Sequence, residues 1–375
     1  MRNQHKPVLI FAQSGRFLAQ SATQAGYRVW VADCFGDQET VSLSERWQTL
    51  APLSELTSND VLSYLSTLTR GEDCILICGS GIESSYSFLD KLPINIQYIG
   101  NSFKTISTLK VPQLFFDTLS KLQLPFPDTV FEKPNTSSTW LVKSASGSGG
   151  SHIQYLKNTE ATSNHYFQQY TSGCSGSVLF LANGKQCQII SINKQLISAN
   201  NNSPFRLGSI ETPWLISSAH QDQLELAINK ITAEVSLLGL NSLDFIISDK
   251  GKLILLEINP RPSASAELFN NKADLFQQHI DACNGLLPSI SMVMPTEKRA
   301  LHYIYASSDV IIPFEMNWPA ECHDLPISGS HIYEGEPICT ALIDVKENQF
   351  SNNLSIVIEQ TIFSQLSPLF SSRLI

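Results

Sequence analysis

Two acidic residues are spaced so that they would face each other across a β-hairpin. The sequence predicts strands over residues 242–247 and 253–259, joined by a turn over residues 249–252. If this hairpin closes symmetrically about the turn, Asp244 lies directly opposite Glu257. Because two opposed carboxylates repel each other and destabilise a sheet, a cation is expected between them.

The residues around Glu257 favour a magnesium site. Side chains alternate along a strand, so Asn259 points to the same side of the hairpin as Glu257. Oxygen ligands from Asp, Glu and Asn, completed by water and phosphate, are typical of Mg²⁺, and Mn²⁺ could take the same place. Arg261 continues the alternation, and its guanidinium could hold a phosphoryl or carboxylate group with two hydrogen bonds. The alternative is an acidic strand face that is simply exposed to water.

A glycine-rich loop could bind phosphate. A predicted strand ends at Lys143 and is followed by a loop of small residues that contains Gly147, Gly149 and Gly150. The backbone N–H groups of such a loop can surround phosphate oxygens, and Lys143 adds a positive charge. The loop is not a Walker P-loop, because no Gly-Lys-Ser/Thr follows it. A flexible hairpin tip would have the same composition.

The elements that would position these groups begin with an alternation of strands and helices. A helix is expected over residues 14–24, and apolar runs predict strands at residues 8–11, 28–32, 75–77 and 96–99. This βαβ pattern predicts a parallel sheet covered by helices. The turn after the first strand lacks the glycine spacing of a dinucleotide-binding fingerprint, so NAD is not expected.

Helices and strands alternate less regularly after residue 100. We expect a helical segment over residues 100–123, with Pro112 in a first turn, which tolerates proline. A second helix is predicted to have Ser218 as its N-cap, where Gln221 would complete a capping box, and to end at Gly239. Beyond about residue 295, short strands and turns indicate a small β-rich cap.

The composition excludes several classes of protein. The chain has 375 residues, of which 42% are hydrophobic, so it can bury sizeable cores and is not a disordered protein. Its formal net charge of -9 argues against a duplex nucleic acid as partner. No two cysteines form a Cys-x-x-Cys pair, and no stretch approaches the roughly 20 apolar residues of a membrane-spanning helix. We expect a cytoplasmic protein.

In this order, the motifs resemble the ATP-grasp superfamily. The resemblance covers about residues 100–295 and rests on Lys110, Lys143 with its glycine loop, Phe167–Thr171, Asp244 and the run Glu-Ile-Asn-Pro-Arg at Glu257–Arg261. It implies an α/β fold, in which a two-lobe α+β ATP-grasp core follows a Rossmann-like parallel-sheet domain. The implied domains are residues 1–99, residues 100–295 with a hinge near residues 167–171, and a β-rich C-terminal cap of residues 296–375.

The resemblance also implies a role for each residue. ATP would be bound by Lys110, Lys143, Gly147, Gly149, Gly150 and the hinge residues Gln168, Gln169, Tyr170 and Thr171. The Gln169 carbonyl and the Thr171 N–H would read the adenine edge, and Gln168 stands where the family often has Glu. Mg²⁺ would be held by Asp244, Glu257 and Asn259. Lys143 and Arg261 would act in catalysis, Arg261 by steadying an acyl phosphate.

Enzymes of this superfamily activate a carboxylate with ATP, release ADP and let an amine displace the phosphate. The implied partners are therefore a small-molecule carboxylate and an amine, and members of the superfamily are often homodimers. Carboxylation of biotin is disfavoured, because Pro262–Glu267 replaces the Gln-Val-Glu-His run of biotin carboxylases. An ATP-binding sensor or scaffold without turnover is the alternative.

The N-terminal residues indicate a narrower group. The string that includes Ser14-Gly15-Arg16 and Phe35-Gly36-Asp37 is similar to a group of stand-alone carboligases akin to tyramine–glutamate ligase. That resemblance implies glutamate or another amino acid as substrate, in the biosynthesis of one-carbon cofactors of the methanofuran or tetrahydromethanopterin type. Arg16 and Arg206 are candidate anchors for a carboxylate of the acceptor, and His152 is a candidate phosphate contact.

Overall fold

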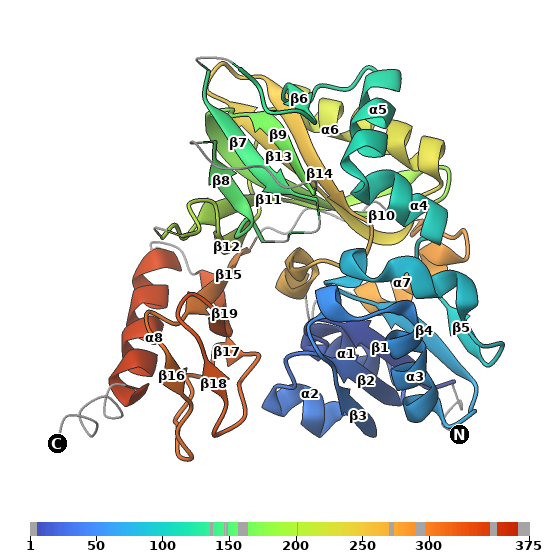
Figure 1. Cartoon of the computed structure of the whole chain (residues 1–375), viewed down its shortest axis with the longest axis vertical. Coiled ribbons are helices and arrows are strands. Elements are labelled where there is room, and N and C mark those ends of the chain that lie inside the picture. The colour runs from blue at the N-terminus through green and yellow to red at the C-terminus, as the bar shows by residue number, and fades with distance from the viewer. Residues whose placement is uncertain are drawn as a thin grey trace.

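An N-terminal parallel sheet, a small antiparallel sheet and a large antiparallel sheet make up most of the computed structural model (Figure 1). The structure describes residues 6–135, 138–145, 147, 149–156, 164–200, 202–269, 274–289, 297–345 and 351–366. In these segments, no helix combines the length and the apolar character needed to cross a membrane.

The first hundred residues form the predicted parallel sheet. Its strand order is β3 (Arg46–Thr49), β2 (Val29–Asp33), β1 (Val8–Ala12), β4 (Cys74–Cys78) and β5 (Ile96–Tyr98). Strand β1 lies at the centre, and every residue in it is buried, because apolar side chains pack against both of its faces. The helices that follow the strands are α1 (Arg16–Gln24), α2 (Gln38–Leu43) and α3 (Ser58–Thr69).

Two helices connect this sheet to the rest of the chain. They are α4 (Phe103–Lys110) and α5 (Pro112–Lys121), in place of the single helical segment that was predicted. Val111 between them is extended, with φ -82° and ψ 112°, because a residue before proline disfavours the helical conformation. Pro112 then begins α5, in the first turn as predicted. Lys110 is therefore the last residue of α4, where its side chain can leave the helix end.

The small sheet carries Lys143 and Gln168. Its strand order is β6 (Thr129–Val130), β9 (His165–Gln169), β7 (Trp140–Ser144) and β8 (Ile153–Tyr155). Antiparallel pairing sets Leu141 opposite Gln168. Because Lys143 lies two residues after Leu141, Lys143 and Gln168 share one face of this sheet.

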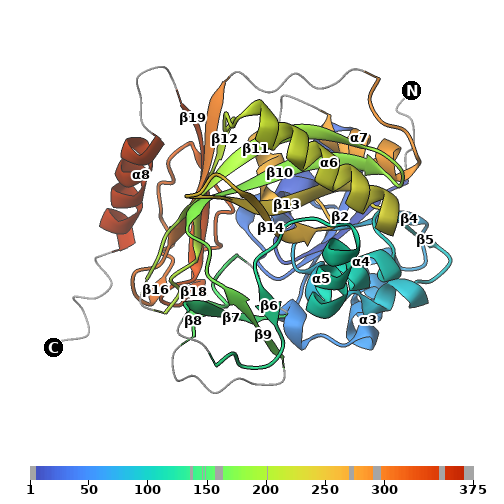
Figure 2. The same cartoon turned by 90° about the horizontal axis from the view of Figure 1, so that it is seen from above.

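The large sheet carries the predicted hairpin. Its strand order is β14 (Leu253–Asn259), β13 (Leu238–Ser248), β10 (Gly173–Asn183), β11 (Cys187–Ile197), β12 (Leu207–Thr212), β15 (Lys298–Tyr305), β19 (Pro337–Val345) and β17 (Cys322–His323). Helix α6 (Ser218–Val235) lies across one face (Figure 2). The other face meets η4 (Ala264–Phe269) and α7 (Leu275–Cys283).

Helix α6 differs from the prediction at both ends. Its N-cap is Ser217 rather than Ser218, so the helix begins at Ser218. It ends at Val235 rather than near Gly239, because Ser236 adopts a left-handed conformation with φ 55°. Gly239 already belongs to β13.

Strands from the C-terminal segment extend the large sheet. Strand β12 pairs with β15, and β15 pairs with β19, so the sheet continues beyond residue 295, where a cap was expected to begin. Beside these strands, β16 (Val310–Ile311) pairs with β18 (His331–Ile332), and α8 (Ser351–Leu366) packs on the same apolar core. The C-terminal segment therefore completes the large sheet, and the division of the chain into three domains stays a prediction.

Candidate functional site

Asp244 lies directly opposite Glu257 on β13 and β14, as the sequence predicts, but through a β-bulge that the sequence did not indicate. Nearer the turn Phe245 pairs with Leu255, so Leu256 is an extra residue in β14. Both Phe245 and Leu255 are fully buried in the core beneath α6. Without the bulge, the strict alternation of side chains would turn Glu257 into that apolar core.

The paired carboxylates fit a divalent cation. Asn259 follows two residues after Glu257, and its Oδ1 lies 3.4 Å from a terminal nitrogen of Arg261. Within the described ranges, no group of three or more His, Cys, Asp or Glu side chains could hold a metal ion, so the donors here would be two carboxylates and one amide oxygen. The ammonium of Lys110 donates to Glu257. A positive charge thus stands where the sequence predicts a cation.

The two carboxyl groups differ in pKa. Burial raises the pKa of Asp244 to about 7 and the charge of Glu257 adds to the rise, although Gln195 donates to Asp244 Oδ1 at 3.2 Å. Burial also acts to raise the pKa of Glu257, but the ammonium of Lys110, together with smaller contributions from His152 and Lys143, brings that pKa below its ordinary value. Lys110 therefore favours the ionised form of Glu257. A further positive charge, such as a bound cation, would favour the ionised form of Asp244.

Lys143 is buried and held by Gln168. Its Nζ donates to Gln168 Oε1 at 2.6 Å, and Gln168 Nε2 donates to the Thr129 hydroxyl at 3.1 Å. Burial lowers the pKa of Lys143 to about 8, while the charges of Glu257 and Asp244 act in the opposite direction. Lys143 thus lies near the carboxylate pair. The Gln168 side chain supports Lys143 and is itself buried, so it does not project from the hinge.

The described part of the glycine loop packs against the start of β12. Gly150 has φ 75°, and a Cβ there would lie 2.0 Å from the carbonyl oxygen of Phe205. The Gly149 carbonyl accepts a hydrogen bond of 2.9 Å from the first residue of β12. A Cβ on Gly147 would lie 1.9 Å from the ring of His152. Glycine is therefore required at Gly147 and Gly150 by close approach, which the composition alone did not distinguish from a flexible tip.

The residues predicted to form the hinge lie at the end of β9, and backbone hydrogen bonds hold them in place. The Gln169 N–H donates to the Asp128 carbonyl at 2.8 Å, and the Tyr170 N–H donates to the Thr139 carbonyl at 2.9 Å. Thr171 follows in the connection to β10 and is partly buried. The backbone of this segment is thus held by the residues that come directly before β6 and β7.

An aromatic cluster beside the hinge was not predicted. The ring of Tyr155 lies 5.9 Å from that of Tyr170 and 5.1 Å from that of Phe205, measured between centroids. Tyr155 and Tyr170 are 38% and 39% exposed. Their exposed faces provide a surface on which a flat base could stack. The three rings come from separate segments, so no spacing in the sequence indicates that they meet.

Arg261 is held by a residue that sequence reasoning missed. Its Nε donates to Glu83 in η2 (Ile82–Ser84), and Glu83 in turn accepts from the Gly81 N–H at 3.0 Å. Arg261 also donates to the Pro262 carbonyl at 3.3 Å. The guanidinium, two residues beyond the end of β14, is therefore positioned by the short helix η2 of the N-terminal part as well as by neighbours in its own segment.

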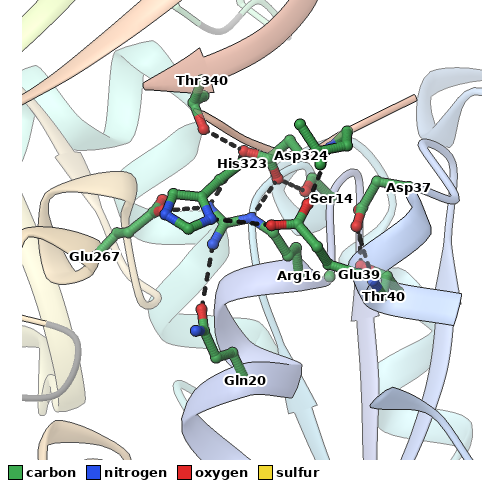
Figure 3. A network of polar contacts seen from close by, with 12 residues as sticks. Ser14, Arg16, Gln20, Asp37, Glu39, Thr40, Glu267, His323, Asp324 and Thr340 are labelled. Atoms are coloured by element: carbon green, nitrogen blue, oxygen red, sulfur yellow. Dashed lines mark hydrogen bonds and ion pairs between the residues drawn. The ribbon is translucent and has the colours of Figure 1, made fainter. Parts of the chain in front are cut away.

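Arg16 is not a free anchor for an acceptor, contrary to expectation. It is 1% exposed, and its guanidinium pairs with Glu267 and, at 2.9 Å, with Asp324 (Figure 3). Asp324 also accepts from the hydroxyls of Ser14 at 3.0 Å and Thr340 at 2.6 Å. These contacts join α1 to η4 and to the C-terminal strands. The guanidinium of Arg16 therefore forms ion pairs that connect α1, η4 and the C-terminal segment.

The guanidinium of Arg206 also has partners within the protein. Its guanidinium lies 3.6 Å from the centroid of the Tyr305 ring and donates to the carbonyls of Ser198 at 3.1 Å and Gly335 at 3.0 Å. It is 9% exposed. The prediction that Arg16 and Arg206 are available to bind a carboxylate of the acceptor was therefore wrong. Residue type alone does not show which partners a guanidinium already has.

Comparisons with known proteins give a domain family for part of the chain and a fold for most of it. Residues 113–265 match the family model of the ATP-grasp domain. An L-amino acid ligase from Bacillus licheniformis has a similar structure, with a TM-score of 0.69 and 14% identity over 96% of this chain and 97% of that chain. An N5-carboxyaminoimidazole synthetase from Staphylococcus aureus, complexed with ADP, has a TM-score of 0.69 and 16% identity over 96% and 98% of the two chains. No curated protein matches the chain.

A third similar structure is the biotin carboxylase domain of the 2-oxoglutarate carboxylase from Hydrogenobacter thermophilus. Its TM-score is 0.71, with 12% identity over 91% of this chain and 87% of that chain, and it contains MgADP, ADP and bicarbonate. The family match includes Lys143, the hinge and the bulged hairpin through Arg261, whereas Lys110 lies just before it. The chain therefore carries an ATP-grasp domain over residues 113–265 and has the overall fold of ATP-grasp ligases.

Proposed function

We propose that the protein is an ATP- and Mg²⁺-dependent ligase that joins a carboxylate to an amine and releases ADP and phosphate. The observation that carries the proposal is the pairing of Asp244 with Glu257 across the bulged hairpin, with the ammonium of Lys110 on Glu257. Lys143 lies near enough for both carboxylates to influence its pKa. Oxygen donors for a hard cation beside two ammonium groups suit a bound triphosphate.

The residues of the site would position the charged groups of Mg²⁺ and ATP. Asp244, Glu257 and Asn259 would hold Mg²⁺, which neutralises phosphate charge when bound. Lys110 and Lys143 would bind phosphate oxygens, and the backbone N–H groups of the glycine loop would donate to the same phosphates. The Gln169 carbonyl and the Thr171 N–H would bind the adenine edge, with Tyr170 and its aromatic neighbours beside it. Positioning and charge neutralisation are the main contributions of such a site.

The proposed reaction has two steps. A carboxylate oxygen attacks the γ-phosphorus of ATP, the bond from that phosphorus to ADP breaks, and an acyl phosphate forms. An amine nitrogen then attacks the acyl carbon, the carbon–oxygen bond to phosphate breaks, and the nitrogen loses a proton. Arg261 would steady the acyl phosphate with its terminal N–H groups, while its Nε donates to Glu83.

An amino acid, with glutamate as the first choice, is the substrate class that we propose. The N-terminal string around Arg16 and the similar fold of the L-amino acid ligase from Bacillus licheniformis support this class. A role in one-carbon cofactor biosynthesis, a homodimeric state, a cytoplasmic location and the use of Mn²⁺ in place of Mg²⁺ are narrower proposals from the sequence.

A substrate panel tests the function. Purified protein with Mg²⁺ and ATP should form ADP and phosphate only when a suitable carboxylate and amine are both present. With the carboxylate alone, hydroxylamine should trap the acyl phosphate as a hydroxamate. Glu257→Gln is the inactive control, because it removes the negative charge of a proposed metal ligand. AMP and pyrophosphate as products would contradict the proposal, and tight ATP binding without turnover across the panel would favour the sensor or scaffold.

A further inference from the structure

Lys110 compensates the charge of Glu257 in the structure. The side chain of Lys110 is only 10% exposed, and its Nζ bonds to Glu257 Oε1. Lys110 ends α4, and α4 packs against β14. Its ammonium therefore reaches the hairpin from a neighbouring helix, at the carboxylate proposed to bind the metal.

The other cations near the hairpin are held by different partners. Lys143 donates to Gln168 at 2.6 Å, and Arg261 donates to Glu83 at 2.8 Å. In the part of the chain that the structure describes, Lys110 is thus the residue that forms an ion pair with Glu257. A substitution that removes the ammonium of Lys110 would therefore take the ion-pair partner from Glu257. The contacts of Lys143 with Gln168 and of Arg261 with Glu83 would remain.

A divalent cation cannot share Glu257 with Lys110 without cost. Two positive charges on one carboxylate repel each other, and the repulsion is stronger where water is partly excluded. If the ammonium moves away instead, it loses its ion-pair partner in a largely buried position, which is also unfavourable. A nucleotide phosphate would give Lys110 a new partner and would remove that cost.

We propose that Lys110 makes metal binding at the Asp244–Glu257 pair depend on the nucleotide. Without nucleotide, Lys110 occupies Glu257 and weakens the binding of free divalent cations. With nucleotide, a phosphate binds Lys110 and releases Glu257 to the metal. Metal and nucleotide then bind with positive coupling through one side chain, and by linkage each strengthens the other to the same degree. The inference rests on the proposed ATP site but not on turnover.

Binding of Mn²⁺ to the full chain without nucleotide, followed by electron paramagnetic resonance, tests the inference. Lys110→Met keeps an unbranched side chain as far as Cε but removes the ammonium group, and should bind Mn²⁺ about tenfold more tightly than wild type. Lys110→Arg keeps the charge and should bind Mn²⁺ as weakly as wild type. Lys104→Met is the matched control, because Lys104 is exposed on the same helix. Equal or weaker Mn²⁺ binding by Lys110→Met would overturn the inference.

Two further measurements test the inference, and the first uses wild type alone, so it remains informative if a Lys110 variant fails to fold. Wild type alone should bind free Mn²⁺ with a Kd above about 100 μM, and a Kd below about 10 μM would overturn the inference by itself. In the absence of metal, Lys110→Met should also bind ATP about tenfold more weakly, opposite in direction to its Mn²⁺ affinity. Unchanged ATP affinity would show that phosphate does not bind Lys110, and the proposed exchange would be wrong.

The failure of this inference can be told apart from the failure of the proposed function. If no substrate pair yields ADP but the Mn²⁺ affinities follow the expected order, only the ligase assignment is wrong. If the ligase is active and Lys110→Met binds free Mn²⁺ no more tightly than wild type, only the role of Lys110 is wrong.

Discussion

The Nε of Arg261 donates to Glu83 Oε1 at 2.8 Å, and the two side chains are 11% and 12% exposed. Arg261 follows β14 of the large sheet, whereas Glu83 lies in η2 after β4 of the parallel sheet. The orientation of the guanidinium is thus set by a residue 178 positions away in the sequence. The N-terminal sheet takes part in building the candidate site.

This relationship predicts that Glu83→Gln lowers kcat by about 10- to 100-fold while the KM for ATP changes little, because the guanidinium loses its charged partner and the ATP contacts remain. Steady-state kinetics with a productive substrate pair measure both constants. Glu55→Gln is the control, since Glu55 is exposed in the same domain. A Glu83→Gln enzyme with the kcat of wild type would show that the remaining contacts hold Arg261 well enough.

Gly150→Ala should weaken ATP binding by about tenfold or more, because the added Cβ meets the Phe205 carbonyl oxygen and must displace the glycine loop. Gly149→Ala is a matched control. Gly149 has φ 61° against 75° at Gly150, but a Cβ on Gly149 meets no atom within 4 Å. Calorimetric titration with ATP compares the two variants. Equal losses would mean that backbone strain, and not the contact with Phe205, sets the loop position.

Arg16→Met should lower the free energy of unfolding by about 3–5 kcal/mol, because it leaves Glu267 and Asp324 buried without their cation. Arg28→Met should cost less than about 1 kcal/mol, since Arg28 and its partner Glu45 are 52% and 46% exposed. Urea unfolding followed by circular dichroism measures both values. Similar small losses for the two variants would indicate that water enters the Arg16 network and compensates it.

The raised pKa of Asp37 predicts that the free energy of unfolding depends on pH. Burial, with a contribution from the charge of Asp324, raises the pKa of Asp37 to about 7, against an ordinary value of 3.8. The folded state therefore keeps the proton more readily than the unfolded chain, and this part of the stability falls as pH rises from about 4 to about 7. Asp37→Asn keeps an oxygen for the Thr40 N–H and removes the titration.

Relative to wild type, the free energy of unfolding of Asp37→Asn should therefore be about 3–4 kcal/mol more favourable at pH 8 than at pH 4, when urea unfolding is measured at both. Asp222→Asn, at an exposed position of α6, should show no such difference between the two pH values. A stability difference for Asp37→Asn that does not change with pH would show that Asp37 ionises without cost in the folded protein.

The sequence predicted those parts of the site that depend on local periodicity. The pairing of Asp244 with Glu257 follows from the two-residue alternation of strands and a recognisable turn. The prediction assumed an unbroken register, whereas the structure reaches the same pairing through the extra residue Leu256. Bulges have no strong sequence signal, because they depend on the twist and packing of neighbouring strands.

Contacts between distant segments could not be predicted. Glu83 with Arg261, and Arg16 with Asp324, are 178 and 308 residues apart, and no periodicity relates such positions. The position of Lys110 on Glu257 was also missed, since it depends on how α4 packs against β14. Side-chain type indicated which residues could carry charge, and tertiary packing decided which charges meet.

Because β15 hydrogen-bonds along the free side of β12, a shortened chain that stopped before residue 297 would expose the backbone groups of β12 to solvent. An open strand edge of this kind recruits other strands and promotes aggregation. A recombinant fragment intended to hold the nucleotide site alone should therefore extend at least through β19, although the family match itself ends at residue 265.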